Sequence, residues 1–253
     1  ISTKLSLFTI LLALIPLLGF GHYLTSSFEK NLKQQVLDDL VLVAETQEGQ
    51  LLTYLETLKT RTVDFPSDGF IRDTVNEIIT KEKNNKMQEA LNHHLIFNKK
   101  ILDPTLIGIN IIDLSGEVIA STDEHEVGKD EKSHTYFTQT LLLPYGKARI
   151  NDITLSHHFG TEIHTIAISA PLTNKQTGEL IGVLVNYYST GHINHLLEGQ
   201  HQKMLGALSG LKGRRDTLDI YLVNSENLMI SQSRFLGNQA FLKQVVRTPP
   251  VQA

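Results

Sequence analysis

The stretch Ile163–Tyr188, IHTIAISAPLTNKQTGELIGVLVNYY, predicts two β-strands joined by a polar turn. Its second half, Leu180–Val185, is an almost unbroken apolar run that is too short for an ordinary helix and rich in β-formers. Such a run is typical of a strand buried on both faces. Thr173–Glu179 is polar and has Gly178 near its end, as a hairpin with a longer loop requires. Because a strand buried on both faces must be covered on each, we expect covering elements elsewhere in the chain.

The composition allows one large domain or two small ones and excludes several kinds of site. The chain has 253 residues, a formal net charge of −4 and no cysteine. Disulfides, cysteine zinc sites and thiol nucleophiles are therefore excluded, and the charge balance is not that of a nucleic-acid binder. Because the chain opens on Ile1 and Thr248–Ala253 resembles mid-chain sequence, we expect a fragment of a longer protein.

The N-terminal segment predicts a membrane anchor. Leu5–Leu24 holds no Asp, Glu, Lys or Arg, and about 20 such residues suffice to cross a bilayer as a helix. Lys4 and Tyr23 lie where a flanking charge and an interfacial aromatic are found. A cleaved signal peptide is the alternative, but no A-x-A-like cleavage site follows. We therefore expect a transmembrane helix at residues 5–24 in a bacterial inner membrane, with the chain extracytoplasmic from about residue 25.

Residues 25–62 predict a long helix, here termed the stalk helix. Apolar residues recur every three or four positions from Phe28 to Leu58, which places one apolar stripe along the helix. An ordinary amphipathic core helix has this pattern. So does a rod that transmits movement to the membrane, or one that pairs with its twin in a homodimer.

Residues 63–190 predict an α+β domain with a PAS-like sheet. Asp64–Gly69 interrupts the stalk helix, and Ser67 or Asp68 is suited to cap the next one. With the opening hairpin, five antiparallel strands are expected, with helices before, within and after them. The other expected elements are helices at 67–80 and 85–99, strands at Leu106–Ile112, Glu117–Ser121 and Ala148–Ser156, and a short helix beginning at His134.

The C-terminal residues predict the start of a second, smaller module. Residues 191–212 are expected to form a connecting helix and a linker. Residues 213–253 then begin a strand–turn–strand unit, with strands at Leu218–Val223 and Leu228–Ser231. This order repeats that of Leu106–Leu141 as a weak internal repeat, and the chain stops before the second copy is complete.

Several short motifs occur in an order and spacing that together are more specific than any one alone. They are the stalk helix, His134-x-Tyr136-Phe137, Ser156-x-x-x-Gly160, Ala170-Pro171, Gly178–Val185, Ile220–Asn224, Leu228–Ile230 and Ser233–Phe235. Over nearly its whole length the chain resembles the extracellular double-Cache sensors of bacterial transmembrane receptors. The resemblance implies a membrane-distal PAS-like domain, a membrane-proximal one, and a cytoplasmic output module beyond this chain. That output would be a histidine kinase, a diguanylate cyclase or a chemotaxis transducer.

The resemblance also implies a ligand pocket in the distal domain, between the sheet and the loop-helix of Tyr136 and Phe137. His134 falls where many amine and amino-acid binders have an arginine for the ligand carboxylate. Tyr187 falls where they have an aspartate for the ligand ammonium. Without these two charged anchors a zwitterion would lose its charge-assisted hydrogen bonds. We therefore expect a small-molecule ligand other than an ordinary α-amino acid.

Thr154 and Ser156 complete the expected ligand-binding set, because alternation places both hydroxyls on one side of their strand. His134 and Tyr136 have an alternative role in capping and packing the short helix, and Tyr187 one as a buried strand residue. We expect no catalytic residue, no metal and no other cofactor in this chain, and no nucleic-acid partner.

Two other functions stay open. His157, His158 and His164 suggest a membrane-anchored metal-dependent hydrolase, since a hairpin can bring histidines together across its strands. Against it, adjacent His157 and His158 point oppositely on a strand, and no carboxylate–histidine spacing of a known metal motif is present. The other possibility is an anchored structural or adhesion domain, which a solidly packed face beside Tyr136 would favour.

Overall fold

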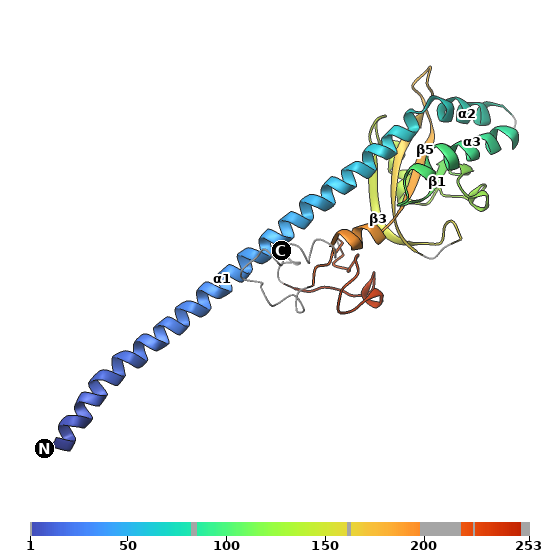
Figure 1. Ribbon diagram of the computed structural model, residues 1–253. Coiled ribbons are helices and arrows are strands. Elements are labelled where there is room, and N and C mark those ends of the chain that lie inside the picture. The colour runs from blue at the N-terminus through green and yellow to red at the C-terminus, as the bar shows by residue number, and fades with distance from the viewer. Residues whose placement is uncertain (1, 82–84, 161–162, 198–218, 225, 249–253) are drawn as a thin grey trace. The chain divides into compact units, whose positions relative to one another are not determined.

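The computed structural model describes residues 2–81, 85–160, 163–197, 219–224 and 226–248, and only the backbone of residues 2–11, 13 and 238. The helices α1, α2 and α3 come first, and the strands follow with short helices among them, which is an α+β order (Figure 1). The elements are α1 Ser2–Ser67, α2 Gly69–Thr80, α3 Asn85–Asn98, η1 Lys100–Leu102, β1 Leu106–Ile112, β2 Val118–Ser121, η2 Glu124–Glu126, α4 Thr135–Thr138, η3 Thr140–Leu142, β3 Arg149–Ser156, β4 Ile163–Thr173, β5 Leu180–Ser189 and η5 Asn238–Ala240.

α1 is one uninterrupted helix through both the predicted anchor and the predicted stalk helix (Figure 1). It continues beyond the predicted end at residue 62 and includes Pro66 in its last turn. The missing N–H and the ring of Pro66 affect the carbonyl of Thr62 in the preceding turn, so the cost is confined to about one hydrogen bond close to the end of the helix. The chain divides into two compact units within α1, between Glu48 and Gly49, and the sheet belongs to the second unit.

The membrane-anchor prediction is not confirmed. Among the described residues, no helix is both long enough and apolar enough to cross a bilayer. Residues 5–24 are helical, as predicted, but the side chains of residues 2–11 and 13 lie outside the described part.

The sheet has the five antiparallel strands that the sequence predicts, in the order β2-β1-β5-β4-β3. β5 is the central strand, and every residue between Leu180 and Ser189 in it is buried. Alternation along β5 sends Leu184 and Tyr188 into one apolar cluster and Val185 and Tyr187 into another. The expectation of a strand covered on both faces is therefore correct.

The β4–β5 hairpin closes through the predicted polar turn. The Asn174 N–H donates to the Glu179 carbonyl at 2.8 Å. Gly178 has a φ of 73°, which glycine adopts without strain. Pro171 pairs with Val183 of β5, and the pairing of β4 with β3 ends at Ser169. The missing N–H of Pro171 therefore lies where β4 has a neighbour on one side only.

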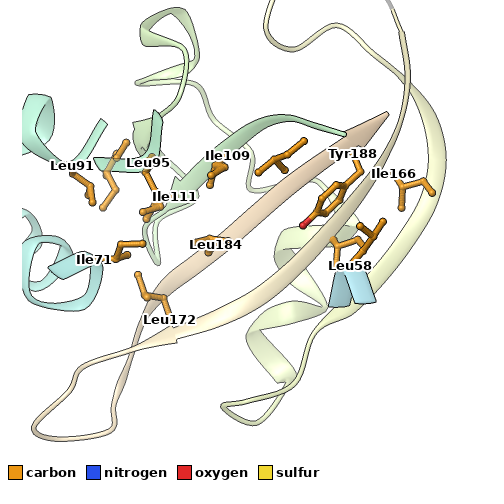
Figure 2. Packing of buried hydrophobic residues seen from close by; sticks show 14 of the residues in the cluster. Leu58, Ile71, Leu91, Leu95, Ile109, Ile111, Ile166, Leu172, Leu184 and Tyr188 are labelled. Carbon is orange, nitrogen blue, oxygen red and sulfur yellow. The ribbon is translucent and has the colours of Figure 1, made fainter. Parts of the chain in front are cut away.

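Helices α1, α2 and α3 cover the first face of the sheet, which we term the Tyr188 face. Figure 2 shows Ile71, Leu91 and Leu95 at one end of this layer and Leu58 beside Tyr188. These residues are fully buried, and each contributes about 1.5–3 kcal/mol through removal of apolar surface from water. The last turns of the stalk helix thus cover one face, as predicted, but α2 and α3 share that role.

The described residues from 219 onward pair through isolated bridges. Val223 pairs with Met229, and the Ile230 N–H donates to the Leu222 carbonyl at 2.8 Å. Asn227 turns the chain with a φ of 61°. The predicted pairing across the turn is therefore present through an isolated bridge, but the described residues from 219 onward form no strand, and the second module stays a prediction. The connecting helix is present over residues 191–197, and residues 198–218 of the predicted helix and linker lie outside the described part.

Gly182 leaves room for a neighbouring strand. A Cβ at this position would lie 2.4 Å from the Ile112 carbonyl oxygen, and that oxygen belongs to the backbone of β1. We predict that Gly182→Ala lowers the free energy of unfolding by about 1–3 kcal/mol, because the two strands must move apart. Gly49→Ala is the matched control, since nothing lies within 4 Å of its Cβ position. It should stabilise α1 by up to about 1 kcal/mol. Urea denaturation of both variants measures the change in the free energy of unfolding, and equal changes would contradict the prediction.

Asp68 joins the start of α2 to the end of α3. One carboxylate oxygen caps α2 by accepting from the Phe70 N–H at 2.9 Å. The other lies 2.7 Å from Lys99 Nζ and 3.1 Å from His94 Nε2. Burial alone would raise the pKa of Asp68, but the hydrogen bonds from Lys99 and His94 outweigh it and lower the pKa to about 2.

This lowered pKa predicts an acid-sensitive contribution to stability. The contribution is fully present above the ordinary carboxyl pKa of 3.8 and is lost as the pH falls through the folded-state value of about 2. Asp68→Asn keeps a capping oxygen but removes the charge, so the stability of this variant should depend less on pH in that window. Thermal unfolding measured from about pH 5 to about pH 1, a range that brackets both pKa values, is the test. Identical pH profiles for the two proteins would contradict the assignment.

Candidate functional site

The second face of the sheet, which we term the Tyr187 face, is covered by α4 and η3. Tyr136 and Phe137 of α4 are buried against Val183, Val185 and Tyr187 of β5. The loop-helix that contains the Tyr-Phe pair is therefore the cover that the sequence predicts for this face. The Tyr187 face also buries the carboxylates of Glu126 and Glu131 close to each other.

Tyr136 is the centre of a polar and aromatic cluster. Its hydroxyl donates to Glu131 Oε2. Its ring stacks on His134 with centroids 4.8 Å apart and meets Tyr187 edge-on at 5.9 Å. Burial raises the pKa of Tyr136 far above its ordinary value, with further contributions from Tyr187 and Glu131. The hydroxyl therefore keeps its proton and acts as a donor at physiological pH.

Glu126 lies at the end of η2 and is almost completely buried. Its Oε2 is 2.6 Å from His158 Nδ1, and its Oε1 accepts from Lys129 Nζ at 2.6 Å and from the Phe159 N–H at 3.0 Å. Burial alone would raise the pKa of Glu126, but the hydrogen bonds from His158, Lys129 and Phe159 outweigh it and lower the pKa to about 2. Glu126 is therefore a carboxylate in the folded protein.

Glu126, Glu131 and His158 converge on one point. Each offers an oxygen or nitrogen atom, and these atoms all lie within 4.8 Å of one another. This cluster was not predictable from the sequence, because Glu126 and His158 are 32 positions apart and both glutamates belong to a polar stretch without a recognisable motif. The short spacing Glu126-x-x-Lys129 was the one local signal, and it marks an ordinary ion pair equally well.

Two buried polar atoms beside this cluster form no well-aligned hydrogen bond with the described residues, although Tyr136 and Asn110 lie close enough to Tyr187 to affect its pKa. They are the Tyr187 hydroxyl and the Asn110 Nδ2. The Tyr187 ring lies 4.9 Å from the His158 ring and 5.2 Å from the Phe159 ring. An unpartnered buried polar group costs about 1–3 kcal/mol. Such groups are expected where a ligand or an ordered water supplies the missing partner.

Glycine at position 108 makes the packing around Tyr187 possible. Gly108 pairs with Tyr187 across β1 and β5. A Cβ there would come within 2.2 Å of the Phe159 ring, so Phe159 could not lie over the strand. Phe159 itself has a φ of 58°, and this turn brings its backbone N–H to Glu126.

The predicted ligand-binding residues lie in different surroundings. Tyr136, Phe137 and Tyr187 are buried together, and His134 is half-exposed at 3.2 Å from Glu131 Oε2. Ser156 is buried and its Oγ accepts from the His158 N–H at 3.1 Å, whereas Thr154 is exposed. The structure thus brings together all of the predicted set except Thr154, and their role in binding stays a prediction.

The three histidines of the hydrolase hypothesis are not brought together. His158 contacts Tyr187, whereas His164 stacks on Phe241 with centroids 3.8 Å apart. Phe241 belongs to the cluster of the Tyr188 face, so the two histidines serve opposite faces of the sheet. His157 is exposed. His157 and His158 lie in the turn after β3, whereas alternation along β4 directs His164 to the Tyr188 face.

Neither a protein-family model nor a curated protein matches this chain. Solved structures do. The sensor domain of the histidine kinase DctB from V. cholerae superposes with a TM-score of 0.62 and 15% identity over 87% of this chain and 74% of that one. The sensory domain of the Campylobacter jejuni chemoreceptor Tlp3 with isoleucine bound gives 0.53 and 14% over 90% and 79%. This chain has the fold of these sensor domains. The predicted resemblance to double-Cache sensors is confirmed at that level.

Tyr136→Phe tests the hydroxyl–carboxylate contact inside the cluster. We predict a loss of about 1–3 kcal/mol in the free energy of unfolding, because buried Glu131 loses a donor. Tyr145→Phe is the matched control, since Tyr145 is about half exposed and its change should stay within about 0.5 kcal/mol. Urea denaturation compares them. Equal stabilities of the two variants would show that the contact contributes nothing.

Proposed function

We propose that this chain is the extracytoplasmic ligand-sensing region of a bacterial transmembrane receptor. The shared fold with sensor domains of a histidine kinase and a chemoreceptor supports this. The observation that carries the proposal is the pair of unpartnered polar atoms buried on the Tyr187 face, at Tyr187 and Asn110. A domain that served only as structure would gain stability by replacing them with apolar groups. The cytoplasmic output, a kinase, diguanylate cyclase or chemotaxis transducer, would lie outside this chain.

The ligand is proposed to bind on the Tyr187 face, under the loop-helix of Tyr136 and Phe137. His134, with its half-exposed ring, would form the entrance, and the Tyr187 hydroxyl the floor. Ser156 would act indirectly, since its hydroxyl holds the backbone of His158. Thr154 is exposed and is the weakest member of the set.

The charges on this face favour a cationic ligand group over a carboxylate. Glu126 and Glu131 are both almost completely buried, and Glu126 is ionised. A ligand carboxylate placed beside them would meet like charge in a medium of low dielectric. The Tlp3 domain was solved with isoleucine, but this arrangement supports our proposal that the ligand of the present chain is not an ordinary α-amino acid.

β5 offers a route from the ligand face to the stalk helix. Tyr187 points to one face, and its neighbours Asn186 and Tyr188 point to the other. Asn186 Nδ2 donates to Thr62 Oγ1 of α1 at 3.1 Å and to the Tyr188 hydroxyl at 3.1 Å. A ligand that prefers one position of β5 would thereby favour one position of α1.

The membrane anchor and the homodimer belong to the same proposal. The anchor rests on the sequence of Leu5–Leu24. The dimer rests on the predicted apolar stripe of α1, in which Phe28 and Leu32 are 72% and 50% exposed. Pairing of two stalk helices would cover such a stripe.

A ligand screen with two matched tyrosine variants tests the proposal. Binding of small-molecule libraries to the purified full chain is measured by thermal shift and then by isothermal titration. Tyr187→Phe should leave the unliganded protein as stable as before or more so, because its hydroxyl has no partner. The same variant should weaken binding of a hit about three- to tenfold, the value of one hydrogen bond.

Tyr188→Phe is the control on the opposite face. It removes a hydroxyl that accepts from Asn186, so it should lower stability by about 1 kcal/mol and change ligand affinity less than Tyr187→Phe does. Failure of every ligand class to stabilise the protein would contradict direct sensing. Equal losses of affinity in the two variants would contradict the placement on the Tyr187 face.

A further inference from the structure

We propose that Glu126, Glu131 and His158 form a binding site for a divalent transition-metal ion. The inference deepens the proposed function. It rests on that function only for the claim that the ion is a ligand of the sensing face. The binding itself rests on the geometry of the three side chains.

The separations suit one small ion after a modest movement of side chains. Ligand atoms of the three residues lie within 4.8 Å of one another. A tetrahedral ion with bonds of about 2.0–2.2 Å holds its ligand atoms roughly 3.4 Å apart. His158 Nδ1 and Glu126 Oε2 are now closer than this, at 2.6 Å, and share a hydrogen bond. A cation that replaces the shared proton would separate this pair and draw Glu131 inward.

A positive charge would stabilise the two buried glutamates of the cluster. Two glutamates with side-chain exposures of 2% and 3% face each other, and Lys129, 43% exposed, pairs with Glu126 alone. Burial of carboxylates in a medium of low dielectric costs several kcal/mol each unless a cation compensates them. A single divalent ion would neutralise both.

Tyr187 provides an independent indication. Its hydroxyl is buried without a hydrogen-bond partner, and its ring lies against that of His158. Three protein ligands leave an open fourth position on a zinc-like ion, which a water molecule or a small ligand fills. A group bound there would give the Tyr187 hydroxyl the partner that it lacks among the described residues.

The surrounding contacts are of the kind that orient metal ligands. Tyr136 donates to Glu131, and the Phe159 N–H donates to Glu126. Partners of this kind fix ligand side chains in many metal sites. The donor set of one imidazole and two carboxylates favours Zn²⁺ or another first-row transition ion over Mg²⁺ and Ca²⁺, which take oxygen ligands.

Titration of the metal-free full chain with Zn²⁺ tests the site. Calorimetry is expected to give one saturable site, and thermal unfolding a Zn²⁺-dependent rise in Tm that Mg²⁺ and Ca²⁺ do not produce. His158→Gln and Glu131→Gln are expected to weaken Zn²⁺ binding at least about tenfold. His157→Gln is the matched control, since His157 is the exposed neighbour. It should bind like the wild type.

A second readout uses the wild-type protein alone, in case a buried substitution prevents folding. The chain has seven tyrosines and no tryptophan, so tyrosine emission is directly observed. Zn²⁺ on Glu131 should alter the emission of Tyr136 with the same midpoint as the calorimetric titration, since Tyr136 donates to that carboxylate.

The outcomes separate this inference from the proposed function. Absence of one-site Zn²⁺ binding, or an equal loss in His157→Gln, overturns the metal site. If an organic hit then binds and responds to Tyr187→Phe, the sensor proposal stands without the metal. One-site Zn²⁺ binding that His158→Gln removes and His157→Gln retains supports the metal site, whichever organic compounds bind.

Discussion

The structure depends on the burial of one strand, β5, on both of its faces. Eight consecutive residues of β5 are buried, from Ile181 to Tyr188. A strand in that position must pair on both edges and be covered on both sides. β1 and β4 supply the edges, and the helices supply the covers. The order of the remaining elements follows from this requirement.

The two covers are chemically different. The Tyr188 face is closed by α1, α2 and α3 mainly through aliphatic side chains. Its buried polar groups include Asn186, whose Nδ2 donates to Thr62 and whose Oδ1 has no partner among the described residues. The Tyr187 face buries carboxylates, an imidazole and a tyrosine hydroxyl without a partner. Apolar packing on the Tyr188 face stabilises the domain. This stability offsets the free-energy cost of burying polar groups on the Tyr187 face. A functional site is therefore expected on the Tyr187 face, where the buried polar groups lower stability.

Much of the fold was predictable because local patterns carry it. The β-rich composition of Leu106–Ile112 and the apolar run in β5 predict strands, Gly178 predicts the turn, and Asp68 caps α2 as expected. The exact helix end was not predictable. Pro66 predicts a break in the helix, yet α1 includes it in its last turn at the cost of about one hydrogen bond, the one to the Thr62 carbonyl.

The candidate site was predictable only where a family resemblance applied. Tyr136, Phe137 and Tyr187 were found in that way, and they do meet on one face. Glu126 and Glu131 were not, because no local spacing links them to His158. The hypothesis that three histidines form one site was wrong for the opposite reason. His158 and His164 are near in sequence, but the sheet lies between them.

By itself, the sequence determined the strands, the turns, the caps and the need for two covers, since each of these depends on residues within a few positions of one another. Only the tertiary structure decided which polar side chains share a buried space. Glu126, Glu131 and His158 come from a loop and a turn that β1 and β5 bring to one face. Electrostatic interactions act through space, so the charge that this face attracts depends on folded distances that no spacing along the chain records.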